Sequence, residues 1–191
     1  MNRWLPFAFV TCALLLAACA PTAAAPAVPS ATASAGAGGG TARGSYVRLS
    51  TMGTVPAGVG RGVVGIRIGT EGAEPGPAEL YLYDASYTEA GTDQSRVPDA
   101  NFAGGMGHWG SSDPAMVKLE PSDRGSGQML HLTDAAGTAL ALNSGEFAVT
   151  PGAAYSLSFG ARLVPTTHGS LVLLFLAGSE TSRVTIPLSP R

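Results

Sequence analysis

The stretch that decides the fold is Ala154-Tyr155-Ser156-Leu157-Ser158-Phe159-Gly160-Ala161, in which apolar residues alternate with small polar ones. A period of two is the signature of a β-strand with one face in the core and the other in solvent. A second stretch, Leu171 to Ala177, is apolar at every position, which is typical of a strand buried between two layers. Together they predict a protein built from packed β-sheets.

Shorter runs of the same kind follow Tyr46 throughout the chain, separated by turns rich in Gly, Pro, Asn and Asp. They predict further strands at Gly62–Ile68, Glu79–Asp84, Met116–Leu119, Gln128–Thr133, Phe147–Thr150 and Arg183–Leu188. No stretch supports a helix of three turns. We therefore expect an all-β fold, a two-sheet β-sandwich or jelly roll.

Length and charge limit the number of domains and the kinds of partner. The 191 residues suffice for one domain and its appendages, and the formal net charge is -2. The 11 basic residues are scattered singly, so no concentrated positive field exists to hold a phosphate backbone. Both cysteines, Cys12 and Cys19, precede the expected domain, which excludes a disulfide or a zinc-thiolate site within it.

The N-terminus carries the pattern of a secretory signal over residues 1–18. Arg3 precedes an apolar run, Phe7–Ala18, that is shorter than the roughly 20 residues a membrane-spanning helix needs. The run ends in Leu16-Ala17-Ala18-Cys19, which resembles the lipobox of bacterial lipoproteins. The resemblance implies lipidation of Cys19 and, because position 20 is Ala, an outer-membrane location. An ordinary signal cleaved near residue 20 is the alternative.

The segment that follows, residues 19–45, predicts a lipid-anchored tether. From Ala20 to Ser45 it is almost wholly Ala, Pro, Ser, Thr and Gly, which cannot bury enough apolar surface to offset the entropy of ordering the chain. The folded domain is therefore expected over residues 46–191, standing off the membrane on a disordered linker.

Several motifs in the domain resemble the galactose-binding-like carbohydrate-binding modules attached to xylanases and cellulases. The opening of that family is matched by Asn101-Phe102 followed by Gly104, Gly105 and Trp109, and its next turn and strand by Pro151 to Phe159. Its closing half is matched by Val55 to Gly58 with Val63 to Ile68, and by Leu80 to Ser86. The resemblance implies a jelly roll that binds a glycan.

The order of these matches is reversed, since the closing half precedes the opening half. In one interpretation, residues 46–87 fold beside Arg183–Leu188 and complete a circularly permuted sandwich with residues 101–191, joined by residues 88–100. In the other, the chain carries fragments of two adjacent modules. We favour the permuted domain, because two half-sandwiches would each leave an apolar face and open strand edges in water.

Sugar binding requires aromatic faces for stacking and polar groups that bond hydroxyls. Residues of these types that could serve are Trp109, Tyr81, Tyr83, Arg67 and Asn143, with Tyr46 and Tyr87 as further candidates. Tyr81 and Tyr83 are two residues apart and so share one face of a strand, opposite Leu80 and Leu82. Either pair could face the core. The opening Trp of the family is usually structural, which favours a core role for Trp109 as well.

The sequence offers residues for two different metal sites. The family's structural Ca²⁺ uses an acidic residue after the opening Phe and an Asp on the closing strand; this chain has Ala103 at the first position and Asp84 at the second, which counts against the site. The three histidines, His108, His131 and His168, form the alternative. Two lie in Met-x-His patterns whose ligand set suits copper, and a three-histidine copper site would suit superoxide dismutation. Copper dismutases carry a His-x-His strand and usually a disulfide, and neither is present.

The expected function is that of a non-catalytic accessory module in the cell envelope. No nucleophile elbow, phosphate-binding loop, zinc motif or Cys-x-x-Cys occurs in the sequence, and the carboxylates are few and isolated. The module would bind a surface glycan or an envelope protein complex without a cofactor, and not nucleic acid. The alternatives are the copper protein with dismutase-like activity and a purely structural subunit that adds strands to a partner's sheet.

Overall fold

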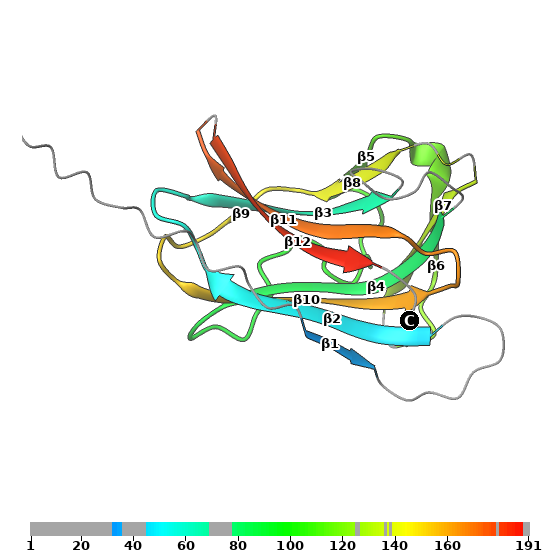
Figure 1. Cartoon of the computed structure of the whole chain (residues 1–191), viewed down its shortest axis with the longest axis horizontal. Helices are drawn as coiled ribbons and strands as arrows, with labels where there is room; N and C mark the ends of the chain where they lie inside the picture. The colour runs from blue at the N-terminus through cyan, green and yellow to red at the C-terminus, as the bar shows by residue number, and fades with distance from the viewer. Residues whose placement is uncertain are drawn as a thin grey trace, which may run out of the picture.

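Two antiparallel sheets packed face to face make up the fold (Figure 1). The computed structural model describes residues 32–35, 45–68, 78–124, 127–135, 137, 139–178 and 180–188. We name as sheet A the strand order β1-β2-β10-β4-β7-β6, and as sheet B the order β12-β11-β3-β8-β5, with β9 also paired to β3. The expected all-β, two-sheet architecture is confirmed.

Each predicted run coincides with a strand, most of them longer than predicted, whereas β1, β2, β5 and β8 were not predicted as strands. Sheet A contains β1 (Thr32–Ala35), β2 (Ser45–Thr54), β4 (Ala78–Glu89), β6 (Val117–Pro121), β7 (Gln128–Asp134) and β10 (Ala154–Leu163). Sheet B contains β3 (Arg61–Ile68), β5 (Trp109–Ser111), β8 (Leu140–Ser144), β9 (Phe147–Ala148), β11 (Gly169–Ala177) and β12 (Glu180–Leu188). One 3-10 turn, η1 (Pro114–Met116), precedes β6.

Strands from the N-terminal and C-terminal parts of the chain are interleaved in both sheets. β10 lies between β2 and β4, and β3 lies between β11 and β8, so segments far apart in sequence form the same two sheets. Residues 46–87 do not pair with Arg183–Leu188; β2 contacts β12 only from the other sheet. Among the described strands, β12 pairs only with β11 and forms the edge of sheet B, because β11 gives its other edge to β3.

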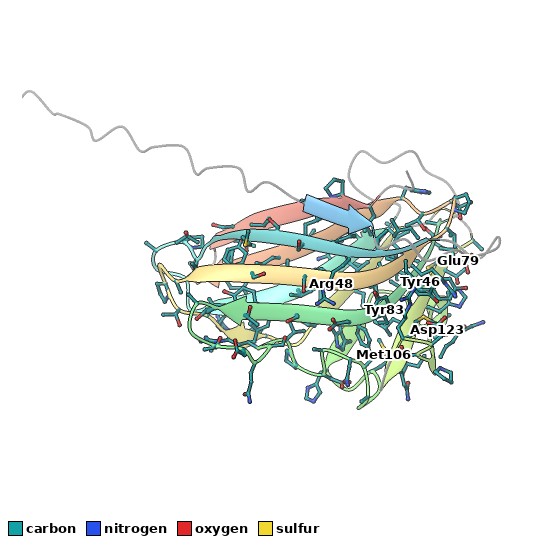
Figure 2. All side chains as sticks on the ribbon, turned by 90° about the horizontal axis from the view of Figure 1, so that it is seen from below. Tyr46, Arg48, Glu79, Tyr83, Met106 and Asp123 are labelled. Atoms are coloured by element: carbon teal, nitrogen blue, oxygen red, sulfur yellow. The ribbon has the colours of Figure 1, made fainter. Side chains whose placement is uncertain are left out.

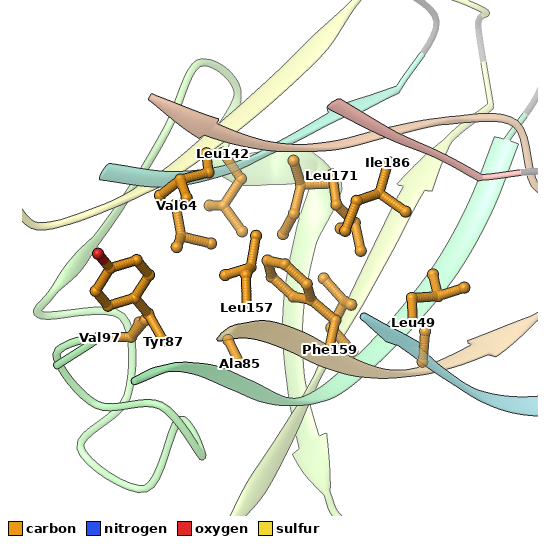
Figure 3. Packing of buried hydrophobic residues seen from close by; sticks show 14 of the residues in the cluster. Leu49, Val64, Ala85, Tyr87, Val97, Leu142, Leu157, Phe159, Leu171 and Ile186 are labelled. Atoms are coloured by element: carbon orange, nitrogen blue, oxygen red, sulfur yellow. The ribbon is translucent and has the colours of Figure 1, made fainter. Parts of the chain in front are cut away.

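The core lies between the sheets and is filled by alternate residues of each strand (Figure 3). Leu157 and Phe159 of β10 are fully buried and face Val64, Leu142 and Leu171 of sheet B. The fully apolar run in β11 has Leu171, Val172 and Leu173 all without exposed surface, so the predicted burial on both faces holds for this part of the strand. Leu174 and Leu176 are partly exposed, because the outer face of sheet B is uncovered further along. Alternation in β10 leaves its serines on the outer face of sheet A.

Part of the segment predicted as a tether is ordered. Thr32–Ala35 forms β1 and pairs with residues 47–50 of β2, since small residues accept an extended backbone and the edge of β2 offers hydrogen-bond partners. The signal sequence, the lipobox and Cys19 lie outside the described residues. Within the described ranges, no helix has the length and apolar character needed to traverse a bilayer.

Candidate functional site

The outer face of sheet A gathers most of the exposed aromatic and basic side chains of β2, β4, β7 and β10. We call the aromatic face the group Tyr46, Arg48, Tyr81, Tyr83, Arg124, His131 and Arg162. In β4, Leu80 and Leu82 are buried and Tyr81 and Tyr83 are half-buried, as the alternation in the sequence predicts. Figure 2 looks onto this face, on which Arg48, Tyr83 and Tyr46 lie together.

Tyr83 lies flat on β10. A Cβ atom at Gly160 would overlap the Tyr83 ring, which shows that the ring rests directly on the backbone of this glycine. The pairing of β4 with β10 shifts register between Gly160 and Ala161, and this bulge aims Tyr83 across its neighbouring strand. Tyr46 meets the ring of Tyr83 edge-on, with centroids 6.1 Å apart at 64°. Tyr83 therefore has one ring face on the sheet and a fixed orientation.

Tyr81 is enclosed on both of its ring faces. The guanidinium carbon of Arg162 is 3.6 Å from the ring centroid, and the His131 ring stacks at 4.1 Å and 13°. A ring covered in this way cannot also stack on a sugar. Tyr81 instead holds Arg162 in place by a cation–π contact beside the other tyrosines.

A hydrogen-bonded network fixes His131. Its Nε2 lies 2.8 Å from Glu79 and its Nδ1 lies 2.8 Å from Glu120, and the Tyr81 hydroxyl donates to Glu79. The hydrogen bond from Tyr81 is the main cause that lowers the pKa of Glu79. Partial burial acts in the opposite direction, and the contact with His131 lowers the pKa further. Burial, and then the contact with Glu79, raise the pKa of Tyr81. Glu79 is thus a carboxylate and Tyr81 a neutral phenol at neutral pH.

The rim of the aromatic face is also paired. The Tyr46 hydroxyl donates to Asp123, and Arg124 lies 3.9 Å above the Tyr46 ring. On the other side, Arg48 contacts Asp84 at 2.9 Å and donates to Ser158 at 2.8 Å.

Side chains of both charges lie over this face. Arg48, Arg124, Arg162 and the neighbouring Lys118 are interspersed with Glu79, Asp84, Glu120 and Asp123. A flat aromatic ring among planar polar groups that already pair with one another suits a neutral, hydroxyl-rich ligand.

The other predicted ligand residues lie elsewhere. Trp109 is 4 % exposed and packs on Phe102 with centroids 5.0 Å apart, so its indole belongs to the core. Tyr87 is fully buried. Arg67 and Asn143 contact each other on the outer face of sheet B, where Arg67 donates to the Asn143 side-chain oxygen at 2.9 Å. The structure thus divides the predicted set between the two sheets.

The histidines do not come together as a ligand group. His131 is in β7, His108 is exposed in the turn before β5, and His168 precedes β11 with its Nδ1 2.9 Å from the Thr166 carbonyl. Among the residues described, no group of three or more His, Cys, Asp or Glu is arranged to hold a metal ion. Asp84, the residue that matches the family's calcium ligand, pairs with Arg48.

Sequence reasoning missed Arg48, Arg124, Gly160 and Arg162. Arg162 directly follows Ala161, the last core position of the alternating stretch, and its outward direction could have been read from that pattern. Its position beside Tyr81 could not, because it depends on which strand neighbours β10. No protein-family model matches the chain, and no curated protein resembles it in sequence.

Proposed function

We propose that this protein is a non-catalytic module that binds a neutral glycan on the aromatic face of sheet A. In this proposal the sandwich is a circularly permuted, galactose-binding-like domain. Support for the permuted interpretation comes from β3 and β4, which pair directly with the C-terminal strands β10 and β11 and not with one another.

The observation that carries the proposal is the placement of Tyr83 over Gly160. A ring fixed against the sheet can stack on the C–H face of a pyranose without losing much side-chain entropy. Arg48, which lies directly across from Gly160 in the β2–β10 pairing, and Asp84 supply donors and acceptors for sugar hydroxyls.

The carboxylates of this face support a binding role over a catalytic one. A glycosidase needs two carboxyl groups free to act as acid and base across the scissile bond. Glu79 and Glu120 both contact His131 at 2.8 Å, and Asp84 contacts Arg48.

The cell-envelope location rests on the N-terminal sequence. An acylated Cys19 would hold the chain on a membrane surface, since several acyl chains bind far more strongly than one. The tether would then present the domain to glycan or to an envelope protein nearby. Recovery of the mature chain without attached fatty acid would overturn this part of the proposal.

The test is the binding of the full chain, extracted in detergent, to a panel of neutral polysaccharides by affinity gel electrophoresis. Tyr83→Ala is expected to weaken retention at least tenfold and Tyr83→Phe to preserve it, because stacking needs the ring and not the hydroxyl. Met52→Ala is the matched control, since Met52 is 71 % exposed on β2 and outside the aromatic face. Equal retention by folded Tyr83→Ala, or capture of a protein partner in place of any glycan, would overturn the proposal.

A further inference from the structure

The outer side of sheet B has an open hollow of about 630 Å³ at its β5 edge. It is lined by residues 107–112, in and around β5, and by Ala141 and residues 143–145 of β8 and the following turn. Asn143 projects from β8 into this hollow, because Leu142 and Ser144 on either side of it point to the core.

Two glycines clear the space around Asn143. In the strand pairing, Gly110 of β5 and Gly65 of β3 lie directly opposite Asn143 on its two sides. A Cβ atom at Gly110 would meet no atom within 4 Å, so the space above it is open. A Cβ at Gly65 would lie 2.8 Å from the Arg67 guanidinium, which shows that Arg67 folds over this glycine toward Asn143. Glycines in a strand interior often mark a site of close approach.

Arg67 fixes the orientation of the Asn143 amide. Its guanidinium donates to the Leu142 carbonyl at 3.2 Å and to the Asn143 side-chain oxygen at 2.9 Å. A guanidinium can only donate hydrogen bonds, so the amide oxygen must face Arg67 and the NH₂ group is left to bond a ligand. The amide therefore presents donors to the hollow.

The other polar groups of the hollow are also suited to donate. The Ser112 hydroxyl oxygen accepts from the Ala141 N–H at 3.0 Å, which leaves its own hydrogen available. The exposed His108 adds a ring that can donate. None of the residues lining the hollow, all of them in described parts of the chain, is acidic. The aromatic face differs from the hollow in this respect, because carboxylates lie beside its cations.

We propose that this hollow is a second carbohydrate site, specific for the carboxylate of an acidic sugar such as a uronic acid residue. The carboxylate accepts from the Asn143 amide and the Ser112 hydroxyl, with the Arg67 charge behind the amide. Charge-assisted hydrogen bonds of this kind are about twice as strong as neutral ones. The carboxylate site stands on the donors of the hollow alone, whereas the choice of a sugar to bear the carboxylate rests on the proposed glycan-binding function.

The test is isothermal titration of the detergent-extracted full chain with trigalacturonate, against galactotriose as the neutral ligand of equal length. Trigalacturonate is expected to bind at least tenfold more tightly than galactotriose at this site. Gly110→Val places a side chain into open space and should abolish this binding without unfolding the protein. Gly60→Val is the matched control, because its Cβ also meets nothing within 4 Å but lies outside the hollow.

The outcomes separate this proposal from the previous one. Asn143→Asp puts a carboxylate in place of the donor and should lower trigalacturonate affinity at least tenfold, while Tyr83→Ala should leave it unchanged. Unaltered affinity in Gly110→Val, no binding by the folded wild type, or loss of trigalacturonate binding in Tyr83→Ala would each overturn the second site. Loss of neutral-polysaccharide binding in Tyr83→Ala bears only on the aromatic face.

Discussion

The outer faces of the two sheets use the same structural device to different ends. On sheet A, Gly160 allows Tyr83 to lie flat across β10, the neighbouring strand; on sheet B, Gly65 allows Arg67 to fold back along its own strand, β3, and reach Asn143. In each case a glycine makes room for a planar side chain. The difference is in the surroundings: an ion pair and the edge-on ring of Tyr46 lie beside Tyr83, whereas glycines and serines surround Asn143.

This contrast indicates which chemistry each face can support. The aromatic face mixes side chains of both charges, and its tyrosines are held in place by Arg124, Arg162, His131 and the sheet itself. The hollow on sheet B has donors, one nearby guanidinium and no lining carboxylate among its described residues. A neutral ligand fits the first and an anionic group the second.

The largest effect is expected when the glycine below Tyr83 is replaced. Gly160→Ala would place its Cβ inside the Tyr83 ring, so the ring must leave the sheet. Overpacking of this kind typically costs about 1–3 kcal/mol in the free energy of unfolding. We expect that loss in urea unfolding, together with at least a tenfold loss of neutral-glycan retention in affinity electrophoresis.

The matched variant on sheet B should give the reverse pattern in binding. Gly65→Ala brings its Cβ to 2.7 Å from the Asn143 side-chain oxygen and 2.9 Å from a Val172 methyl. It should disturb trigalacturonate binding and leave the neutral glycan bound as before. If either alanine variant impaired both ligands equally, the two faces would not be independent sites.

Local patterns were sufficient to predict the sheets but not their neighbours. The alternation in residues 154–161 and the apolar run at 171–177 gave two strands correctly, because side-chain periodicity is a local property. β5 and β8 were not predicted, since these strands have only three and five residues. β2 was also missed, although Leu49 and Thr51 alternate with more exposed residues along it. β1 was missed because its composition is that of a linker and only pairing with β2 makes it a strand.

The candidate site shows the same division. The common face of Tyr81 and Tyr83 follows from their spacing, and the structure agrees. The roles of the two rings differ for reasons no spacing contains: Tyr81 is covered by Arg162 from β10 and His131 from β7, while Tyr83 has a glycine beneath it. Both depend on strand order, which is set by the packing of the whole domain.

A smaller effect is expected from pH. Contacts from Tyr81 and His131 hold the pKa of Glu79 below its ordinary value of 4.5. A carboxyl group with a lowered pKa stabilises the fold above its unfolded pKa, and that contribution is lost as the pH falls through the folded value. Because the Glu79 side chain is 35 % exposed, solvent screening limits this contribution to the free energy of unfolding to below about 1 kcal/mol.

The measurement is urea unfolding of wild type and Glu79→Gln from pH 6.5 to 3. The wild type should be more stable at pH 6.5, and the two curves should converge as the pH drops below 4.5. The difference in the free energy of unfolding between the two proteins reports the contribution of Glu79 alone. Other groups act equally in both proteins, including the buried Glu89, whose pKa is also lowered. A gap that stayed constant across the range would contradict the proposed network.

The smallest effects should come from one exposed ion pair on each face. Arg48–Asp84 at 2.9 Å and Arg61–Glu146 at 2.7 Å both have arginines more than half exposed. Arg48→Ala and Arg61→Ala should therefore each change the free energy of unfolding by less than about 1 kcal/mol.

The effects of these two variants on glycan binding should differ, because Arg48 lies opposite Gly160, where Tyr83 rests, and Arg61 contacts neither proposed site. Loss of one hydrogen-bonding group, about 0.5–1.5 kcal/mol, corresponds to a roughly two- to tenfold weaker neutral-glycan retention for Arg48→Ala. Equal weakening by Arg61→Ala would mean that charge acts at long range over the whole domain, and the assignment of the neutral ligand to one face would fail.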